Sequence, residues 1–215
     1  APVTYGTFTS NVDMKSGAPA FGTPEHFTAS LVAGQLARRI GLPWRCAGGS
    51  AANLGDAQAA NESQFGLWGC LLAGATVVIH AAGWLEGGLS VSYEKLITDL
   101  EVLQMVAELC AGTPATDADI ALDALREVPP MGHFFGAAHT MERYQTQFYE
   151  PLAADWSNIG AWQENGSLDA TARATGIWER TLAEFQAPPL DLDKAAALRD
   201  FIERRTAEGG APPES

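Results

Sequence analysis

Short apolar stretches alternate with longer amphipathic ones through the first half of the chain. Residues 3–8 (VTYGTF), 42–49 (LPWRCAGG) and 75–82 (ATVVIHAA) contain β-branched and aromatic side chains that favour strands. Each stretch is followed by a loop rich in small residues and then by apolar positions at helical spacing. Three strand, loop and helix units in a row predict an α/β protein with a parallel sheet and right-handed crossovers.

The helices of these units begin and end at residues that commonly cap helices. Thr23 precedes a proline at the first helical position, and Gly41 follows the last one. Asp56 and Ser92 precede the second and third helices, and Gly74 ends the second. The apolar spacing also predicts the buried faces. The expected core positions are Phe27, Leu31 and Ile40 in the first helix and Leu96, Leu100, Leu103 and Ala107 in the third, with Asp99, Glu101 and Glu108 outside.

The second half of the chain is mainly helical in its pattern. Residues 113–130 predict one capped helix ended by two prolines, and residues 132–140 (GHFFGAAHT) are suited to one more brief strand. Further helical patterns lie at 141–148, 158–163, 167–185 and 192–207. We therefore expect strand, loop and helix units over 1–115, a mainly helical region over 116–207 and a disordered tail over 208–215.

The charge balance limits the possible partners. The chain has 26 Asp and Glu against 13 Lys and Arg, a formal net charge of -13. Nucleic acids and anionic membranes bind positive surfaces, so we expect neither as a partner. No apolar run is long enough to span a bilayer and no signal peptide opens the chain, which predicts a cytoplasmic protein. Because the first residues are already strand-like, we also expect that a preceding part of the protein is missing.

The three cysteines do not form a recognisable framework. Cys46, Cys70 and Cys110 are odd in number, widely spaced and set in apolar surroundings, and they lack the spacing of a zinc site. We interpret them as buried free thiols of a reducing compartment. The sequence also lacks a phosphate-binding GxxxxGK[ST] loop, a GxGxxG turn after a strand and a GxSxG nucleophile turn.

Candidate chemistry is best sought where the predicted strands end. Ligands of parallel α/β folds bind at the carboxyl ends of the strands, in the loops that follow. His80 ends the third strand, and Glu86 lies in its glycine-rich loop. Each residue also has a plain structural interpretation, as a packed strand-end histidine and as a solvated loop carboxylate.

Aromatic residues and histidines offer two further interpretations. Tyr5, Phe8, Phe21 and Trp84 are individually core or loop-packing residues, but together at one rim they would form an aromatic box for a quaternary ammonium ion. His133 and His139 would complete a metal site with His80 and Glu86, although no HxH or HExxH spacing supports it. His26, in the first turn of a helix, is expected to have a structural role.

Three longer stretches carry a family resemblance. They are residues 2–25 (PVTYGTFTSNVDMKSGAPAFGTPE), 56–63 (DAQAANES) and 80–105 (HAAGWLEGGLSVSYEKLITDLEVLQM). They resemble the trimethylamine methyltransferase family, corrinoid-dependent enzymes that include glycine betaine methyltransferases. The resemblance covers nearly the whole chain and matches the C-terminal portion of longer family members.

The resemblance implies a fold and a reaction. The fold would be part of a (β/α)8 TIM-type barrel, with three to four parallel strands and a helical C-terminal region that completes or flanks the barrel. The reaction would move a methyl group from a methylated amine to the Co(I) corrinoid (cobalamin) of a separate partner protein. Archaeal trimethylamine enzymes have pyrrolysine in the region similar to residues 47–56, and this chain has none. That departure favours a quaternary amine such as glycine betaine, because it already leaves as a neutral tertiary amine.

The resemblance also implies a set of site residues. His80 and Glu86 are the predicted catalytic residues. The predicted substrate-binding residues are Tyr5, Phe8, Asn11, Phe21, Ser50 and Trp84. The predicted corrinoid-facing residues are Gly83, Gly87, Gly88 and His133, and no resident metal is expected.

Two other classes of function stay open at this point. One is a metal-dependent lyase or hydrolase on the same barrel, using His80, Glu86 and His133. The other is a non-catalytic fragment or binding module. Because an isolated part of a barrel exposes strand edges, we expect either a homo-oligomer or a requirement for the missing N-terminal half.

Overall fold

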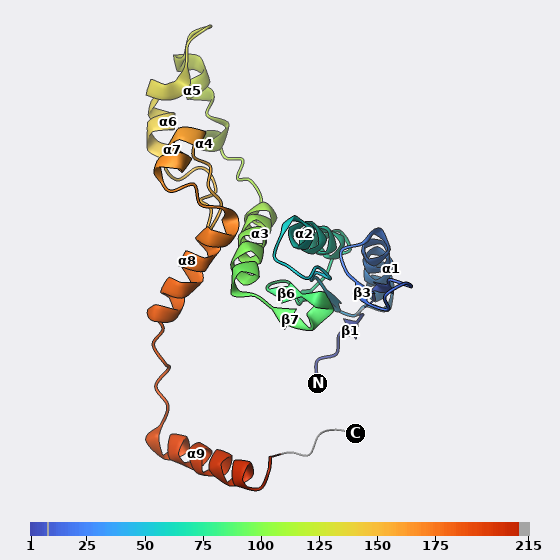
Figure 1. The fold of residues 1–215 in the computed structure, drawn as a ribbon. Coiled ribbons are helices and arrows are strands. Elements are labelled where there is room, and N and C mark those ends of the chain that lie inside the picture. Colours follow the sequence, from blue (N-terminus) through green and yellow to red (C-terminus); the bar gives the residue numbers. More distant parts are fainter. Residues whose placement is uncertain (8, 211–215) are drawn as a thin grey trace. The chain divides into compact units, whose positions relative to one another are not determined.

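The computed structural model describes residues 1–7 and 9–210, and Phe8 and the last five residues lie outside this description (Figure 1). The chain divides into two compact units, Ala1–Glu179 and Arg180–Ser215. The predicted boundary near residue 115, between barrel units and a helical region, stays a prediction.

The first unit contains a parallel three-stranded sheet. It consists of β1 (Tyr5–Gly6), β4 (Trp44–Ala47) and β5 (Val77–Ile79), with β4 in the middle. Tyr5 pairs with Trp44, and Arg45 pairs with Val77. The predicted parallel strands and the mixed α/β class are therefore confirmed.

Three capped helices follow these strands. They are α1 (Pro24–Ile40), α2 (Ala57–Leu72) and α3 (Tyr93–Ala111). Thr23, Asp56 and Ser92 each accept a hydrogen bond from a backbone N–H of the first turn, as predicted. Gly41 ends α1 with a φ of 70°, a left-handed conformation that favours glycine.

The predicted buried faces of α1 and α3 are right only in part, since Leu31 and Leu100 pack against core clusters as expected but other positions differ. The buried residues of α1 are His26, Ser30, Ala33, Gly34 and Ala37, whereas Ile40 is 56% exposed. A Cβ at Gly34 would overlap Ala73, so small residues let α1 approach the end of α2 closely. In α3 the buried positions are Lys95, Ile97, Asp99 and Glu101.

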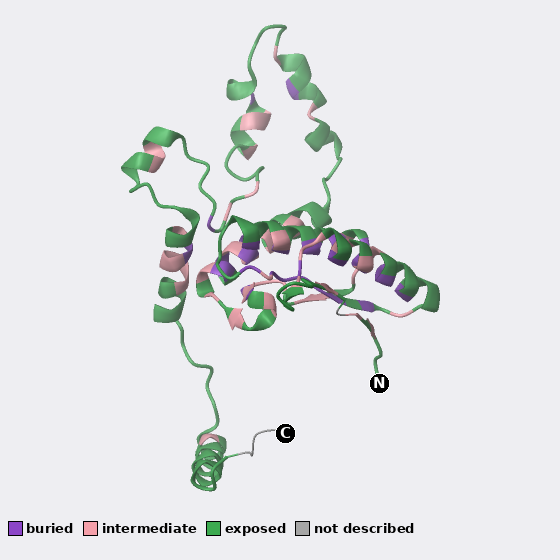
Figure 2. Ribbon diagram, turned by 45° about the vertical axis from the view of Figure 1, so that its right-hand side comes forward, coloured by how far each residue is buried: buried purple, intermediate pink, exposed green. Residues whose placement is uncertain are grey.

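The main core lies between α1, α2 and β4. Its buried members are Ala33, Ala37, Trp44, Cys46, Cys70 and Ala73. Figure 2 shows the buried residues concentrated in α1, α2, α3 and the strands. Cys46, Cys70 and Cys110 are free, as predicted, but Cys110 is exposed because the last turn of α3 is exposed on every side.

Two loops contain short antiparallel pairs that the pattern does not predict. In the loop after β1, β2 (Asn11–Val12) pairs with β3 (Pro19–Ala20). In the loop after β5, β6 (Trp84–Leu85) pairs with β7 (Ser90–Val91) around the 3-10 turn η1 (Glu86–Gly88). Two-residue strands are too short for an alternating pattern to reveal.

The segment after α3 differs from prediction in three places, one of which is the helix expected over 141–148, where the helix ends at Arg143. The expected single helix is two, α4 (Asp117–Ile120) and α5 (Leu122–Glu127), because Ala121 between them has a φ of 55°. The expected strand at 132–140 is wrong. That stretch instead forms the 3-10 turn η2 (Phe134–Gly136) and the start of α6 (Ala138–Arg143), so its aromatic residues lie in a helical turn.

The remaining helices follow the predicted pattern. They are α7 (Ile159–Glu164), α8 (Ala170–Ala183) and α9 (Leu192–Ala207). Residues 208–210 of the expected tail still bond to α9, since the Gly210 N–H donates to Arg205 O at 2.7 Å, and residues 211–215 lie outside the described residues. Within residues 1–7 and 9–210, no helix has the length and apolarity needed to cross a membrane.

Residues 149–154 and α8 pack on α3 through two carboxylates. Glu101 accepts hydrogen bonds from the Tyr149 hydroxyl and from the N–H groups of Ala153 and Ala154. Glu94 accepts from the indole N–H of Trp178 at 2.8 Å. Burial acts to raise the pKa of Glu101, but these hydrogen bonds outweigh it and the pKa is lowered.

We expect the contact between α3 and residues 149–154 to loosen in acid. An unfolded Glu has a pKa of about 4.3. Because the folded pKa of Glu101 is lower, its stabilisation is complete above that pH and is lost as pH falls through the folded pKa. Hydrogen exchange at the Ala153 and Ala154 amides, corrected for intrinsic rates, should therefore accelerate as the pH falls from about 4.3 through the folded pKa. In Glu101→Gln these amides should exchange faster at neutral pH and lack the acid step. If exchange in Glu101→Gln accelerated in acid by the same factor as in the wild type, Glu101 would not be the group responsible.

Candidate active site

Three loops meet at the carboxyl edge of the β1–β4–β5 sheet. The loop after β5 bonds to the loop after β4, since the Glu86 N–H donates to Ala52 O at 3.0 Å and the Gly87 N–H donates to Ser50 O at 3.1 Å. A Cβ at Gly87 would meet Pro19, so the same turn packs against the loop after β1. The loops after β1, β4 and β5 are therefore joined into one surface at the strand ends.

An aromatic cluster lies in this surface, centred on Trp84. The His80 ring stacks on the indole with centroids 4.3 Å apart and planes 12° apart. The Phe21 ring lies 5.1 Å from Trp84, and Phe21 is only 1% exposed. A Cβ at Gly49 or Gly88 would overlap the indole, so these glycines make room for it.

His80 and Glu86 both have a backbone conformation that is rare for non-glycine residues. Their φ angles are 55° and 52°. Such left-handed conformations cost about 1–2 kcal/mol each and persist where the surroundings hold them. Both residues are exposed at the carboxyl edge, His80 directly after β5 and Glu86 at the tip of the β6–β7 turn. The two predicted catalytic residues are thus presented to solvent by strained backbone.

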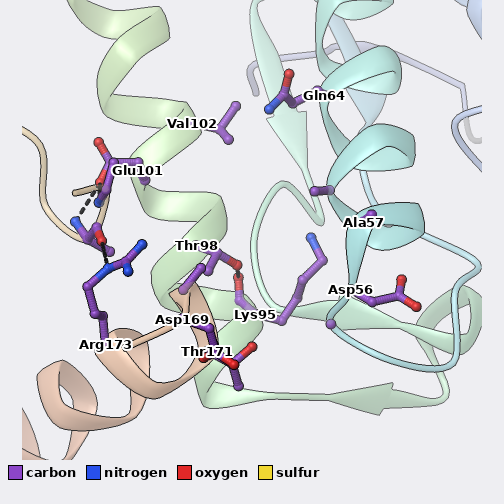
Figure 3. Close-up of a pocket in the computed structure, with 15 residues that line it drawn as sticks. Asp56, Ala57, Gln64, Lys95, Thr98, Glu101, Val102, Asp169, Thr171 and Arg173 are labelled. Atoms are coloured by element: carbon purple, nitrogen blue, oxygen red, sulfur yellow. Dashed lines mark hydrogen bonds between the residues drawn. The ribbon is translucent and has the colours of Figure 1, made fainter. Parts of the chain in front are cut away.

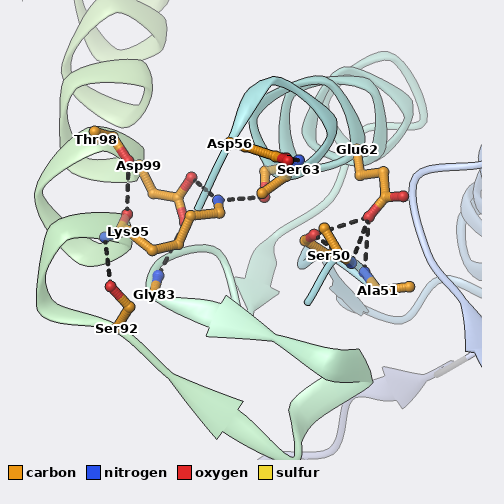
Figure 4. A network of polar contacts seen from close by, with 12 residues as sticks. Ser50, Ala51, Asp56, Glu62, Ser63, Gly83, Ser92, Lys95, Thr98 and Asp99 are labelled. Atoms are coloured by element: carbon orange, nitrogen blue, oxygen red, sulfur yellow. Dashed lines mark hydrogen bonds and ion pairs between the residues drawn. The ribbon is translucent and has the colours of Figure 1, made fainter. Parts of the chain in front are cut away.

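The loop after β4 is attached to α2 by Glu62 (Figure 4). One carboxylate oxygen of Glu62, Oε2, accepts from the Ser50 hydroxyl at 2.8 Å and from the N–H groups of Ala51 and Ala52 at 2.8 and 3.0 Å. The other oxygen, Oε1, accepts from Gln58 at 2.7 Å. Charge-assisted bonds of this kind are about twice as strong as neutral ones.

A buried ion pair attaches the loop after β5 to α2 and α3 (Figure 4). Lys95 Nζ pairs with Asp99 and donates to the Ser63 hydroxyl at 2.8 Å. The second oxygen of Asp99 accepts from the Gly83 N–H at 2.9 Å. Burial raises the pKa of Asp99, against the opposing effect of the Lys95 charge.

Comparison with known proteins identifies the family. A family model described as trimethylamine methyltransferase (MTTB) matches residues 1–210. The chain belongs to the trimethylamine methyltransferase family. The predicted resemblance is therefore confirmed.

The similarity to individual members of the family extends over almost the whole chain. The chain is 35% identical over 210 residues to a glycine betaine methyltransferase of Desulfitobacterium hafniense (strain Y51), covering 97% of this chain and 44% of that protein. It is 34% identical over 213 residues to the trimethylamine methyltransferase MttB of Desulfitobacterium hafniense (strain DSM 10664 / DCB-2), covering 98% and 42%. It is 32% identical over 213 residues to the trimethylamine methyltransferase MttB2 of Methanosarcina mazei, covering 97% and 43%. The chain spans less than half the length of these methyltransferases.

The structure brings some of the predicted site residues of this family member together and separates others. His80, Trp84, Phe21 and Glu86 lie in the loops joined at the strand ends. Tyr5 instead packs on the main core, and Phe8 lies outside the described residues. The roles of these residues in substrate binding stay predictions.

Three other predicted positions have structural partners. Ser50 is fully buried and bonded to Glu62, and the Asn11 side-chain oxygen accepts from the Thr23 hydroxyl at 2.6 Å. Gly83 uses its N–H on Asp99 and its carbonyl on the N–H of Ser92. These contacts explain each residue without a ligand, so their substrate and corrinoid roles rest on the family resemblance alone.

The structure does not assemble the alternative metal site. Among residues 1–7 and 9–210, no three His, Cys, Asp or Glu side chains gather in a group that could hold a metal ion. His133 lies beside Phe135, with ring centroids 5.3 Å apart, and His139 Nε2 lies 3.0 Å from Ala118 O. His26 has the predicted structural role, since it is buried and its Nδ1 accepts from the Gly22 N–H at 3.1 Å.

Sequence reasoning missed Glu62, Lys95 and Asp99, the residues that attach the loops. The pattern predicts Asp99 on the outer face of its helix because it is a charged residue off the apolar stripe. The available signal was the i, i+4 spacing of Lys95 and Asp99, and for Glu62 its place beside a stripe of small residues on α2. Neither signal distinguishes a buried pair from a solvated one.

A separate cavity of about 470 Å³ lies between α2, α3 and the start of α8 (Figure 3). Its charged lining residues already have partners. Lys95 pairs with Asp99, Glu101 binds residues 153 and 154, and Arg173 donates to Ala153 O at 2.7 Å. Asp56 and Asp169 accept from backbone N–H groups at the starts of α2 and α8. Much of the remaining wall is alanine, including Ala57, Ala60 and Ala154. The carboxyl edge, which carries His80 and Glu86, is therefore the stronger candidate site.

Proposed function

We propose that this chain is part of a methyltransferase that moves a methyl group from a methylated amine to the Co(I) corrinoid of a partner protein. The observation that carries the proposal is the aromatic cluster of Phe21, His80 and Trp84, at the carboxyl edge of a parallel sheet in a chain of this family. Parallel α/β folds bind their ligands at this edge.

The three-stranded sheet would be one sector of a (β/α)8 barrel. Its strand, helix, strand order and its parallel pairing support this assignment. In the described part of the chain, β1 and β5 each pair with β4, which leaves their other sides for further strands. The remainder of such a barrel would supply the walls of the site that face these loops.

The methyl donor would be a quaternary amine such as glycine betaine. Ring faces attract a quaternary ammonium ion, and Trp84 is the aromatic residue best suited to this contact. Glu86 would offset the positive charge from the tip of its turn, and the exposed His80 would orient the carboxylate of the substrate. A quaternary donor releases a neutral tertiary amine, so the chain would act by positioning the donor rather than by activating it.

The residues at this edge fit the approach of a corrinoid carried by another protein. Gly88 has no side chain, and Leu89 beside it is 88% exposed, so the tip of the turn offers a low apolar surface. When bound, the corrinoid would supply the cobalt that accepts the methyl group. This chain would hold the donor below that surface and exclude water from it.

We expect calorimetry to detect binding of glycine betaine to this chain. Much of the affinity should come from the ammonium charge of the ligand. The neutral isostere 3,3-dimethylbutanoate has the same shape and carboxylate but lacks the ammonium charge, so it should bind at least about ten-fold more weakly. Trp84→Leu should remove this difference. Glu94→Gln, at the contact of α3 with α8, should retain it. Equal affinities for the two ligands, or no binding of either, would contradict the proposed site.

A further inference from the structure

We infer that Glu62 is a positioning residue of the candidate active site, which sets where Glu86 stands relative to the end of β4. The effect on a ligand rests on the proposed function, but the effect on the loops does not. Glu62 lies on α2, and its half-buried carboxylate is bonded to the loop after β4.

The first step of the argument is the way Glu62 holds residues 50–52. A single oxygen of its carboxylate accepts from the Ser50 hydroxyl and from the N–H groups of Ala51 and Ala52, at 2.8, 2.8 and 3.0 Å. Three donors converging on one anionic oxygen fix the peptide planes that carry them. The orientation of this loop is therefore set by one side chain of a helix.

The second step is that the same loop holds the turn with Glu86. While Ala51 and Ala52 direct N–H groups at Glu62, the carbonyls of Ser50 and Ala52 accept from the N–H groups of Gly87 and Glu86. The distances are 3.1 and 3.0 Å. Only one short loop lies between the Glu62 carboxylate and the backbone of Glu86.

The loop after β1 also rests on Glu62. A Cβ at Gly22 would overlap the backbone of Glu62, and Gly22 has a φ of 67°. Phe21, the neighbour of Gly22, contacts Trp84. The loops after β1 and β4 therefore contact Glu62 directly, and the loop after β5 is attached to it through residues 50 and 52.

The saturation of Glu62 separates its role from that of Glu86. Both oxygens of Glu62 have protein donors, so this carboxylate is occupied in holding the loop. Glu86 is exposed at the tip of its turn. The geometry points to a division in which Glu86 meets the ligand and Glu62 determines where Glu86 stands.

Hydrogen exchange on the full chain tests this inference against a matched control. Glu62→Gln should accelerate exchange at the amides of Ala51, Ala52, Glu86 and Gly87 by at least about ten-fold, because their anchor loses its charge. Glu101 is the control, since it also accepts from one hydroxyl and two neighbouring N–H groups. Glu101→Gln should accelerate Ala153 and Ala154 and leave Glu86 and Gly87 unchanged.

The inference would be overturned if Glu86 and Gly87 exchanged at the wild-type rate in Glu62→Gln, or if amides throughout the chain accelerated equally. Should Glu62→Gln fail to fold, Ser50→Ala removes one of the three donors to Glu62 Oε2 and should give the same pattern with a smaller acceleration.

A binding measurement distinguishes positioning from general stability. If wild-type chain binds glycine betaine, Glu62→Gln should weaken binding at least about ten-fold, whereas Glu101→Gln should not, even where both lower Tm equally. Unchanged affinity in Glu62→Gln would overturn the positioning role. If the wild-type chain binds no methylated amine, the proposed function fails, and the exchange pattern alone decides the role of Glu62.

Discussion

Replacing Lys95 by methionine should lower the free energy of unfolding by about 3–5 kcal/mol, because the change leaves the buried Asp99 carboxylate without its cation. The side chains of Lys95 and Asp99 are 2% and 4% exposed. Methionine matches the length of the lysine stem, so the loss would come from the charge rather than from a cavity. Urea denaturation measures the free energy of unfolding of each protein, and equal m-values show that the difference is one of stability.

An exposed ion pair of the same chain provides the control. Arg126 pairs with Asp123 at 2.9 Å, but these side chains are 75% and 98% exposed. Arg126→Met should therefore change stability by less than about 1 kcal/mol. The double variant Lys95→Met, Asp99→Leu should recover part of the loss, since no charge stays buried. If Lys95→Met were as mild as Arg126→Met, the pair would not be desolvated in solution.

Gly49→Ala should destabilise the chain by about 2–5 kcal/mol, the sum of backbone strain and overpacking. Gly49 has a φ of 109°, and a Cβ there would overlap the Trp84 ring. The indole must then move away from His80 and Phe21. We expect both a lower denaturation midpoint and weaker glycine betaine binding in this variant.

A second glycine isolates the contribution of the backbone. Gly17 has a φ of 78° with nothing within 4 Å of its Cβ position, so Gly17→Ala should cost only about 1–2 kcal/mol. Adding Trp84→Leu to Gly49→Ala should give less than additive destabilisation, because the smaller side chain relieves the overlap. Equal costs for Gly49→Ala and Gly17→Ala would show that the indole does not pack there.

The candidate site was partly predictable. His80, Glu86 and Trp84 follow a strand in the sequence, and the rule that ligands bind at the carboxyl ends of parallel strands selects them. Glu62 was not predictable, because the donors to its Oε2 atom lie ten to twelve residues earlier, in a loop whose shape no local pattern specifies. The contact of Phe21 with Trp84 joins residues of two different loops and likewise requires the fold.

By itself, the sequence determined the features that depend on neighbouring residues. Thr23, Asp56 and Ser92 bond to N–H groups within three residues, so the starts of the helices could be read directly. Only the tertiary structure decided which helix faces are buried and what the strand-end loops hold. The close approach of α1 to α2 selects small residues, and Lys95 and Asp99 are buried because each supplies the charge that the other needs. Such choices depend on which surfaces meet, and that information is distributed over the whole fold.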